Sequence, residues 1–572
     1  MRATFLLRTR IILGVLVCAV LILVVRLWVV QIDQREVFAA RAERQYVRPA
    51  QALYDRGSIF MTDREARTVA AATVRAGYLL AMVPERVADP EAAFAALAPH
   101  LPEVDRETFL AQAARTDDPY EEVARQIEPE AAEEIGALDL PGFQLIRDRW
   151  RYYPGGSLAA RTIGFEAYGA DGVTRAGRYG LERYWEDVLA REEQEVYVNF
   201  FAEIFTNLSQ GLFSRQAARE GDVVTSLEPS VQSYLEAELA ALDDAWSSSR
   251  SGGIVIDPTT GAIYALAVTP GFDLNAFGEA DPDQFGNPLV ESVFEMGSII
   301  KPISMAVGLD TGAVTPETVY HDAGSMTFDG RRIGNFDGRA RGDVPMQEVL
   351  NQSLNTGVAY VMSEVGSERF GEYLLDFGLG QETGIDLPGE VPGLVGNLSS
   401  PRQIEYATAS FGQGIAVTPV ATVRALSALA NGGRLITPHL ATTIEYAGGG
   451  EREIHHPPEG QVIAPETSEE ITRMLVAVVD EALRGGTVAK EHYTIAAKTG
   501  TAQIARSGER GYYDDRFLHT FFGYFPAYEP RFLVFLFTEE PQNVRYASET
   551  LTEPFMSLTD YLINYYEIPP DR

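Results

Sequence analysis

The sequence predicts an α/β protein whose largest domain is an antiparallel sheet flanked by helices, as in a three-layer sandwich. Three consecutive apolar segments near the C-terminus, 493–504, 520–525 and 532–538, have the composition of strands. A further hairpin is expected over 254–268, with a Pro/Gly turn in its middle. Helical patterns stand before and after these strands in the chain, so helices from both ends of the domain are expected to cover the sheet. A mixed α+β pedestal and one N-terminal transmembrane helix are expected before this domain.

Twenty residues near the N-terminus predict a membrane anchor. The stretch Ile11–Val30 is apolar except for Arg26 near its end, and twenty residues just span a bilayer. Three arginines among residues 1–10 place that tail in the cytoplasm by the positive-inside rule. A cleaved signal peptide is the alternative, but no small-residue cleavage site follows the stretch. We therefore expect a single-pass protein of the plasma (inner) membrane, with residues 11–30 as the transmembrane helix and the later residues outside the cytoplasm.

The next segment, 32–215, is charged and contains no catalytic spacing, and we interpret it as a non-catalytic pedestal domain. Its Glu- and Ala-rich stretches 91–100 and 121–137 are expected to form surface helices. Two patches centred on Arg56 and on Arg149-Trp150-Arg151 favour salt bridges inside the domain over a ligand site.

The remaining residues, 216–568, are expected to form one domain that carries the chemistry. Helices are predicted over 228–246, 420–431 and 468–484, and a helix-rich stretch over 346–378. Pro554 is expected to open the last helix.

Composition excludes several classes of partner. The net charge is −34 and the pI about 4.6, which argues against nucleic acid, because phosphate binding requires a basic surface. The single cysteine, Cys18, excludes an intrachain disulfide and a cysteine-based metal site. The histidines are scattered, and the pair His455-His456 lies in a Pro-flanked loop, so we expect no metal and no cofactor.

The strongest functional signal is the stretch Gly297-Ser298-Ile299-Ile300-Lys301-Pro302. A serine and a lysine three positions apart lie on one face of a helix, with their Cβ atoms about 5–6 Å apart. An apolar helical run follows, so Ser298 is expected in the first turn, where free backbone N–H groups face any anion that forms. This is the arrangement of an activated serine nucleophile.

The use of lysine in this chain gives that pattern weight. Of 47 basic residues only three are lysines, Lys301, Lys490 and Lys498. Arginine stays protonated in proteins, whereas a lysine can lose its proton in apolar or cationic surroundings. Two of the three lysines fall in motifs that require a titratable or compact amine, and the third, Lys490, is interpreted as a solvated helix end.

Two further motifs follow in the chain. Ser353-Leu354-Asn355 lies between helical segments, and Lys498-Thr499-Gly500-Thr501 ends an apolar run that reads as a strand. Gly500 permits close approach of another backbone, so an extended peptide can pair with this strand. The lysine and the two threonine hydroxyls suit a carboxylate. The ordered set S-x-x-K, S-x-N and K-T-G is the signature of penicillin-binding proteins and class A β-lactamases.

From about residue 221 to 566 the chain resembles the transpeptidase domain of a class B penicillin-binding protein, and the FtsI-like division branch more than the elongation branch. Supporting stretches are Phe294-Glu295-Met296-Gly297-Ser298, Gly412-Gln413-Gly414 and Lys498-Thr499-Gly500-Thr501-Ala502-Gln503. The pedestal resembles the family less closely, because Arg56-Gly57-Ser58-Ile59 and Asp63-Arg64 are separated by two extra residues and Ala66 replaces a usual glycine.

The resemblance implies a monofunctional, serine-type peptidoglycan D,D-transpeptidase that acts in cell-wall synthesis. Ser298 would attack a stem peptide ending in D-Ala-D-Ala, Lys301 would take its proton, and Ser353 would relay a proton to the leaving amine. Asn355 would hold Lys301 and the substrate amide.

The same resemblance assigns substrate-binding groups. Lys498, Thr499 and Thr501 would bind the terminal carboxylate, and the backbone N–H groups of Ser298 and Thr501 would form the oxyanion hole. Penicillin would acylate Ser298. An acceptor amine from a second stem peptide, a membrane glycosyltransferase and other morphogenetic proteins are the implied partners.

Three other functions remain open at this stage. A D,D-carboxypeptidase would pass the same acyl group to water, and a serine β-lactamase would need a carboxylate that activates a deacylating water. A β-lactam sensor or division scaffold would retain the fold without turnover.

Overall fold

The computed structural model describes residues 54–169, 175–191, 219–506, 508 and 511–572. The predicted cytoplasmic tail and transmembrane helix, residues 1–30, lie outside these described residues. Within the described part of the chain, no helix is long and apolar enough to cross a membrane.

By their contacts the described residues form two compact units. The first unit is Tyr78–Asp148. The second unit combines Asp55–Gly77 and Arg149–Arg191 with residues 219–572. Much of the predicted pedestal segment therefore packs with the residues that were expected to carry the chemistry, and the expected domain limits at 215 and 216 stay a prediction.

The first unit is a small α/β body with its own core. Its core side chains include Leu80, Leu97, Phe109 and Ile135. The prediction of a helix over 91–100 is confirmed, but the predicted helix over 121–137 is wrong in its first half. Residues Glu121–Ile127 form a strand that pairs with Tyr78–Met82, and Pro129 then starts a separate helix because its fixed φ suits a first turn. The elements are α3 (Pro90–Leu97), α4 (Arg106–Ala113), β3 (Glu121–Ile127) and α5 (Pro129–Ala137).

The second unit contains a peripheral sheet. Its strands within this unit follow the order β16-β15-β7-β1-β2, in which β1 and β7 are parallel and the other pairs antiparallel. The bounds are β1 (Ile59–Thr62), β2 (Thr68–Met82), β7 (Gly221–Thr225), β15 (Ala441–Tyr446) and β16 (Glu451–Glu453). The strand β2 continues into the first unit.

Arg56 and Arg151, from the two predicted arginine patches, meet on one buried carboxylate. Arg56 Nε donates to Glu182 at 2.7 Å and Arg151 Nε donates to it at 2.5 Å. Glu182 is fully buried, and despite its burial the two guanidinium groups hold the pKa of its carboxyl below the usual range. Arg56 and Arg151 therefore form salt bridges to Glu182 inside the second unit.

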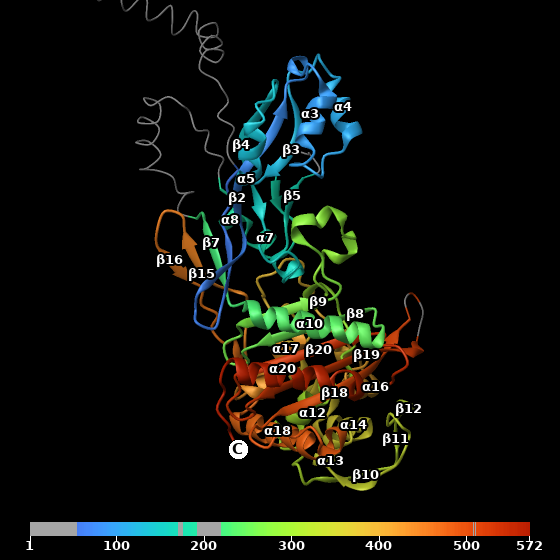
Figure 1. Ribbon diagram of the computed structural model, residues 1–572. Coiled ribbons are helices and arrows are strands. Elements are labelled where there is room, and N and C mark those ends of the chain that lie inside the picture. The colour runs from blue at the N-terminus through green and yellow to red at the C-terminus, as the bar shows by residue number, and fades with distance from the viewer. Residues whose placement is uncertain (1–53, 170–174, 192–218, 507, 509–510) are drawn as a thin grey trace, which may run out of the picture. The chain divides into compact units, whose positions relative to one another are not determined.

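The central sheet of the second unit is antiparallel, as predicted, and its five strands follow the order β18-β19-β20-β8-β9 (Figure 1). The hairpin β8–β9 comes from the start of this part of the chain and the other strands from its end. The bounds are β8 (Arg250–Ile256), β9 (Ile263–Val268), β18 (Ala496–Ala505), β19 (Tyr512–Phe525) and β20 (Phe532–Glu539). Only one side of β18 is paired within the described residues, so β18 is an edge strand.

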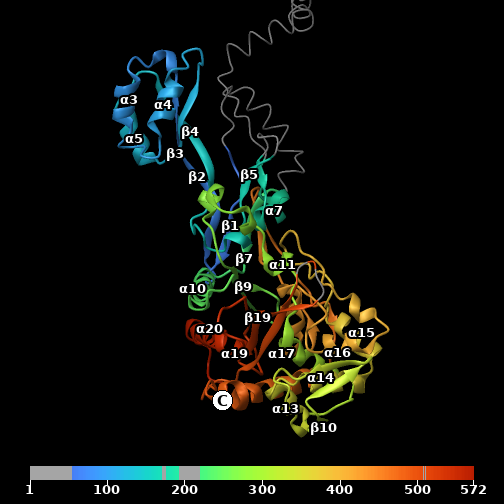
Figure 2. The same cartoon turned by 90° about the vertical axis from the view of Figure 1, so that its right-hand side faces the viewer.

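The sheet separates two cores, because successive side chains of a strand point to opposite faces. On β20, Phe532, Val534 and Leu536 belong to one core, and Leu533, Phe535 and Phe537 to the other. The first face is covered by α10 (Pro229–Trp246) and α20 (Thr552–Tyr565). The opposite face is covered by α12 (Lys301–Asp310), α17 (Pro419–Ala430) and α18 (Pro465–Ala477), which gives the predicted three layers (Figure 2).

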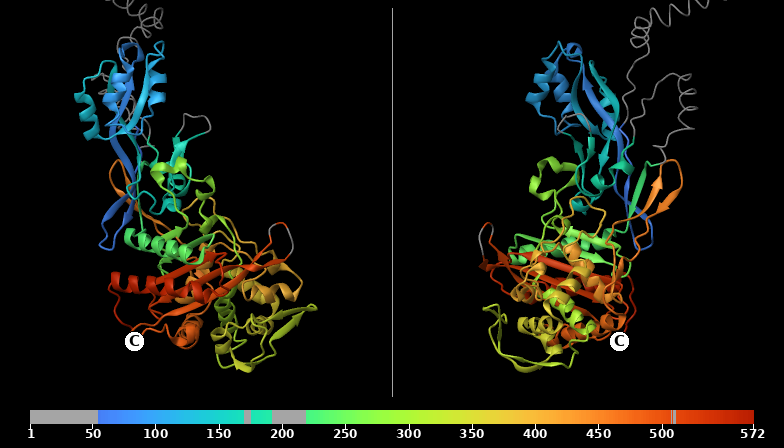
Figure 3. Two further views of the ribbon diagram at one scale, coloured as in Figure 1. Left: turned by 45° about the vertical axis from the view of Figure 1, so that its right-hand side comes forward. Right: turned by 180° about the vertical axis from the view of Figure 1, so that it is seen from behind.

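Short elements complete the second unit. The ribbons built from β10 to β13 lie beside α13 and α14 (Figure 3). Their bounds are β10 (Val319–Asp322), β11 (Ser325–Phe328), β12 (Arg331–Gly334), β13 (Gly342–Pro345), α13 (Met346–Asn351), α14 (Asn355–Val365) and α15 (Ser367–Asp376). The other elements are α6 (Ala160–Ile163), β5 (Glu166–Tyr168), β6 (Arg175–Gly177), α7 (Gly180–Tyr184), α8 (Glu186–Leu189), α11 (Pro288–Glu291), α16 (Gln403–Ala409), β14 (Arg434–Leu435), β17 (Gly460–Gln461) and α19 (Ala547–Thr550), with β4 (Phe143–Tyr152) shared between the units.

The predicted helices are confirmed with small shifts in their limits. The helix expected over 228–246 is α10, and the side chain of Glu228 caps its first turn by accepting from Val231 N. The helix expected over 468–484 is α18 followed by a π-helical turn, η7 (Val478–Ala482). Pro554 is the third residue of the last helix, which begins at Thr552 rather than at the proline.

Candidate active site

Ser298 lies in a tight turn that leads into helix α12. The turn η5 (Gly297–Ile300) is 3-10 helical, and the α-helix begins only at Lys301. Gly297 has φ +63°, and its N–H donates to Gly412 O at 3.1 Å. A Cβ at Gly297 would lie 3.1 Å from Thr501 O, so the turn is held closely against strand β18. The sequence predicted Ser298 at or near the first turn of the helix, and the serine lies in the 3-10 turn directly before the α-helix.

Glu295 ties the same turn to two other segments. Its Oε1 accepts from Gly414 N at 3.1 Å and from the Tyr512 hydroxyl at 3.0 Å. Burial raises the pKa of Glu295 above the usual value. These bonds fix the backbone just before Ser298 from two sides.

The two lysines of the motifs meet on one serine. Lys301 Nζ donates to Ser353 Oγ at 3.1 Å and to Ser353 O at 2.5 Å. Lys498 Nζ donates to Ser353 Oγ at 3.0 Å and to its neighbour's carbonyl, Thr499 O, at 3.1 Å. The Ser353 hydroxyl thus connects two amines that lie 197 residues apart in the sequence.

Both amines are removed from water. Lys301 is fully buried and Lys498 is 3% exposed. Burial, together with the charge of Lys498, holds the pKa of Lys301 well below its ordinary value. Burial alone lowers the pKa of Lys498 to about 7. Burial thus favours the neutral form of the Lys301 amine, which is the form that a general base requires.

Ser353 is held in an uncommon backbone conformation. Its φ is +54°, in the left-handed region that costs a residue other than glycine roughly 1–3 kcal/mol. It lies between α13 and α14, where Leu354 occupies the N-cap position and Asn355 is the first helical residue of α14. In this conformation the hydroxyl and the carbonyl of Ser353 both accept from the Lys301 amine.

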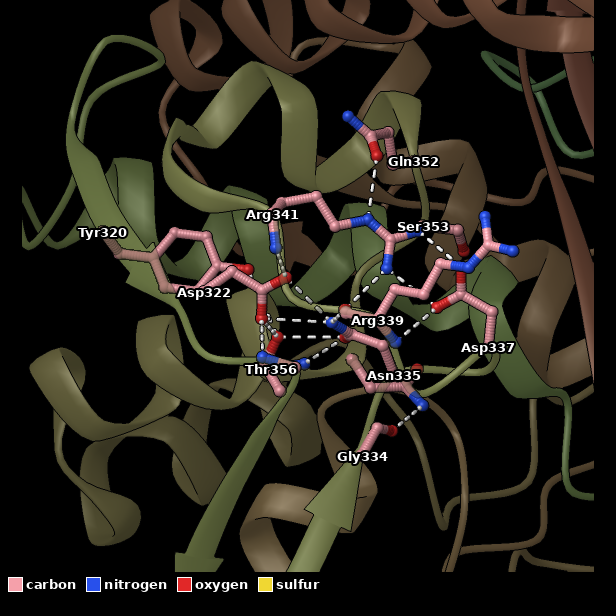
Figure 4. A network of polar contacts seen from close by, with 12 residues as sticks. Tyr320, Asp322, Gly334, Asn335, Asp337, Arg339, Arg341, Gln352, Ser353 and Thr356 are labelled. Carbon is pink, nitrogen blue, oxygen red and sulfur yellow. Dashed lines mark hydrogen bonds and ion pairs between the residues drawn. The ribbon is translucent and has the colours of Figure 1, made fainter.

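Asn355 adjoins a buried polar network, which Figure 4 shows around Asp322 and Asn335. Its Nδ2 donates to Gly334 O at 3.0 Å. The residues that follow these two, Asn335 and Thr356, are also hydrogen-bonded to each other. Thr356 Oγ1 donates to Asn335 Oδ1 at 2.9 Å.

The centre of this network is Asp322, which is 1% exposed. Its carboxylate accepts from Asn335 Nδ2 at 3.0 and 3.1 Å and lies 2.9 Å from Thr356 Oγ1. It also accepts from the backbone N–H groups of Gly324 and Arg341, at 2.9 and 3.0 Å. The ribbon that carries Gly334 and the helix that carries Asn355 are therefore fixed to one carboxylate.

The third motif lies on the edge strand β18. Gly500 is buried beneath the turn of Ser298, and a Cβ there would lie 2.2 Å from Thr520 Oγ1 and 2.9 Å from Met296 O. Thr520 Oγ1 itself donates to Met296 O at 2.9 Å. Only glycine lets the strand approach this closely. The open edge of β18 leaves main-chain groups available to an extended ligand.

A loop after β20 forms a wall beside the end of this motif. Ala547 N donates to Thr501 Oγ1 at 3.1 Å. The fully buried His519, which faces Thr501 in the β18–β19 register, lies 3.1 Å from Arg545 O through Nε2 and 2.9 Å from Thr550 Oγ1 through Nδ1. A carbonyl only accepts, so Nε2 carries the proton and Nδ1 accepts from the threonine. Burial lowers the pKa of His519 to about 4, so the ring is neutral.

These segments enclose one cleft of about 640 Å³. Its lining includes six of the eight residues singled out from the sequence, namely Ser298, Ser353, Asn355, Lys498, Thr499 and Thr501. Lys301 donates to Ser353 from outside the lining, and Gly500 is buried in strand β18 beneath the turn of Ser298. No hydrogen bond joins Ser298 to Lys301 among the described residues, so that contact stays a prediction. The sequence analysis missed the hydrogen-bond network of Asp322 and the hydrogen bonds made by His519 and Glu295. The partners in these bonds are far apart in sequence and carry no local signal.

Comparison with known proteins identifies the family. A family model described as the penicillin binding protein transpeptidase domain matches residues 252–558, and one described as the penicillin-binding protein dimerisation domain matches residues 54–203. The chain belongs to the penicillin-binding proteins. The resemblance to class B penicillin-binding proteins is confirmed, including a pedestal that precedes the transpeptidase fold.

Relatives of this chain come from several bacteria. Stage V sporulation protein D of Bacillus subtilis is 32% identical over 76% of this chain and 66% of its own length. Peptidoglycan D,D-transpeptidase FtsI of Escherichia coli is 28% identical over 78% of this chain and 73% of its own length. The fold is shared with the crystal structure of penicillin-binding protein 3 of Mycobacterium tuberculosis in complex with aztreonam, at a TM-score of 0.67 and 24% identity, covering 91% of this chain and 98% of that one. It is also shared with the crystal structure of penicillin-binding protein 2X of Streptococcus thermophilus, at a TM-score of 0.71 and 18% identity, covering 90% of this chain and 81% of that one.

Proposed function

We propose that this penicillin-binding protein is a peptidoglycan D,D-transpeptidase that cross-links stem peptides through an acyl-enzyme on Ser298. The observation that carries the proposal is the pair of buried lysines, Lys301 and Lys498, which share the Ser353 hydroxyl in the cleft that contains Ser298. Relatives named peptidoglycan D,D-transpeptidases support it.

The first step is activation of the serine. A neutral Lys301 amine has two N–H groups and one lone pair, and the N–H groups are used by Ser353 O and Ser353 Oγ. The lone pair then accepts the proton of Ser298. Ser298 Oγ attacks the carbonyl of the penultimate D-Ala of a stem peptide, which forms a tetrahedral intermediate.

The second step breaks the peptide bond. Ser353, which lies between the two amines, passes its proton to the nitrogen of the terminal D-Ala and takes up the proton that Lys301 holds, and the terminal D-Ala leaves as a free amino acid. The oxygen of the intermediate is stabilised by the backbone N–H groups of Ser298 and Thr501. An amine of a second stem peptide then attacks the acyl-enzyme, forms the cross-link and restores the Ser298 hydroxyl.

Strand β18 supplies the binding of the donor. An extended peptide pairs with its open edge, and Asn355 holds the peptide amide. Lys498, Thr499 and Thr501 bind the terminal carboxylate, for which the Lys498 amine must be charged. β-Lactams enter the same cleft and acylate Ser298, because their ring amide occupies the place of the terminal peptide bond.

The experiment that tests the function follows the fate of the acyl group. The full chain is given a D-Ala-D-Ala peptide donor with and without an amine acceptor, and the products are separated by mass. We expect release of D-Ala and a cross-linked product that disappears in Ser298→Ala. Release of D-Ala with only hydrolysed product would indicate a D,D-carboxypeptidase. Rapid turnover of penicillin would indicate a serine β-lactamase, and the absence of any covalent species would indicate a sensor or scaffold.

The cellular setting is part of the proposal. The apolar stretch Ile11–Val30 anchors the protein in the plasma membrane with residues 1–10 in the cytoplasm and the catalytic domain outside. The relatives named FtsI and stage V sporulation protein D favour a role in division, beside a membrane glycosyltransferase and other morphogenetic proteins. Protease added outside spheroplasts should remove the catalytic domain, and a protected catalytic domain would overturn this orientation.

A further inference from the structure

The cleft has a charge that differs from that of the rest of the protein. The chain contains 81 acidic and 47 basic residues. The described lining of the cleft nevertheless contains no Asp or Glu, and it contains four cationic side chains, Arg341, Arg484, Lys498 and Arg545. Positive side chains that gather in the cleft of an acidic protein concentrate anions there.

Two of these cations already have partners. Lys498 bonds to Ser353 and Thr499 O, and under the proposed function its charge binds the C-terminal carboxylate. Arg341 forms an ion pair with Asp337, at 2.7 and 2.9 Å, and also donates to Gln352 Oε1 at 3.0 Å. Neither group is available for a second anion without losing these bonds.

Arg545 is different, because its backbone is fixed and its guanidinium is not paired. Its carbonyl accepts from the neutral ring of His519, and two residues later Ala547 N donates to Thr501 Oγ1. The exposed guanidinium lies 5.6 Å from the ring centroid of Tyr546, and within the described residues no carboxylate pairs with it. The backbone of Arg545 is therefore held by hydrogen bonds, and its guanidinium, which pairs with no carboxylate of the described residues, lies next to the end of the K-T-G motif.

Arg484 reaches the same cleft from another segment. It follows the π-helical turn η7, which packs against β18, and it lines the cleft together with Ala482 and Leu483. Its guanidinium is exposed and has no carboxylate partner in the described part of the chain. The cleft thus has two uncommitted cations in addition to Lys498.

We propose that Arg545, assisted by Arg484, forms a second anion subsite in the cleft, so that the enzyme prefers acyl donors with a free carboxylate besides the C-terminal one. The inference rests on the proposed function, since the first carboxylate is that of the donor's C-terminus. The chemical class of the substrate is therefore an acidic stem peptide with an unmodified second carboxylate.

Two penicillins provide a matched test. Carbenicillin differs from benzylpenicillin by one carboxylate on the side-chain carbon, and both acylate by the same chemistry. The second-order rate constant for acylation of Ser298 is measured for each with the full chain. We expect the ratio of the carbenicillin to the benzylpenicillin rate to fall about threefold to fivefold in Arg545→Gln and to fall less in Arg484→Gln, as for a partly exposed ion pair. Arg545→Lys should retain most of the ratio, and 0.5 M salt should lower it in the unmodified chain.

The control removes one positive charge elsewhere. Arg452 is an exposed arginine on β16 and does not line the cleft. Arg452→Gln should leave the ratio unchanged, and an equal fall there would overturn the subsite in favour of a general effect of net charge. An unchanged ratio in both cleft variants, with Ser298 still acylated, would also overturn it and leave the proposed function standing. Failure of both penicillins to acylate Ser298 would instead overturn the proposed function.

Discussion

The choice of lysine over arginine explains much of this site at the scale of single residues. Lys301 and Lys498 are the two buried lysines, and burial lowers the pKa of both. Arginine could not lose its proton there. The third lysine, Lys490, bonds to Asp560 at 2.6 and 2.7 Å at a partly exposed position. Lysine is therefore placed where a titratable amine is needed, and Lys490 is the exception that forms an ordinary ion pair.

The pH dependence of acylation follows from these two groups. The rate should rise with pH as Lys301 loses its proton, because the base must be neutral. It should fall again as pH rises through about 7, because Lys498 then loses the charge that binds the carboxylate. Lys301→Arg should lower the acylation rate at least about 100-fold at every pH. Stopped-flow acylation by benzylpenicillin from pH 5 to 9 measures the profile, and an unaltered profile in Lys301→Arg would contradict the assigned role.

At the scale of elements, the site depends on close approach of the strand β18 to the turn η5. Gly500→Ala would place a methyl group 2.2 Å from Thr520 Oγ1, which itself holds the carbonyl just before Gly297 and Ser298. We expect the free energy of unfolding to fall by about 1–3 kcal/mol and the acylation rate to fall with it. Thermal denaturation and acylation by benzylpenicillin measure the two effects. The control is Gly278→Ala, where a Cβ meets no atom within 4 Å and little change is expected.

The network around Asp322 makes a separate prediction. Asn335→Ala leaves the carboxylate of Asp322 and the hydroxyl of Thr356 each without one partner, which should cost about 1–3 kcal/mol of stability. Because the same network positions Asn355, the acylation rate of the folded protein should fall about tenfold. Asn287 is an equally buried amide that caps α11 outside the cleft. Asn287→Ala should lower the melting temperature without lowering the acylation rate, and equal acylation by both variants would contradict the positioning role of Asn335.

At the scale of the whole molecule, local patterns predicted the layers but not their connections. Short apolar runs bounded by turns identified β20 and the hairpin β8–β9. The same reasoning assigned 121–137 to one helix, since Glu and Ala favour helices and only pairing with β2 makes Glu121–Ile127 a strand. Segments 55–77 and 149–191 pack with residues 219–572 through distant contacts such as those of Ser58 with Asp222 and of Arg161 with Gly286, which no local pattern encodes.

The sequence predicted those parts of the site whose residues lie close together within one motif. Ser298, Ser353 and Lys498 were identified from short spacings, and the fold brings them to one cleft. The left-handed conformation of Ser353 and the clamp formed by His519 depend on partners that are tens of residues away. The contact between Ser298 and Lys301 stays a prediction, which assumed an α-helical turn; the turn is 3-10 helical, and the Lys301 amine donates to Ser353.

The central claim is that Ser298 is a nucleophile activated by the paired lysines. Mass spectrometry of the intact protein after exposure to benzylpenicillin tests it most directly. The account predicts one added penicilloyl group, located on the peptide that contains Ser298 and absent from Ser298→Ala. An unmodified mass, or an adduct on any other residue, would contradict it.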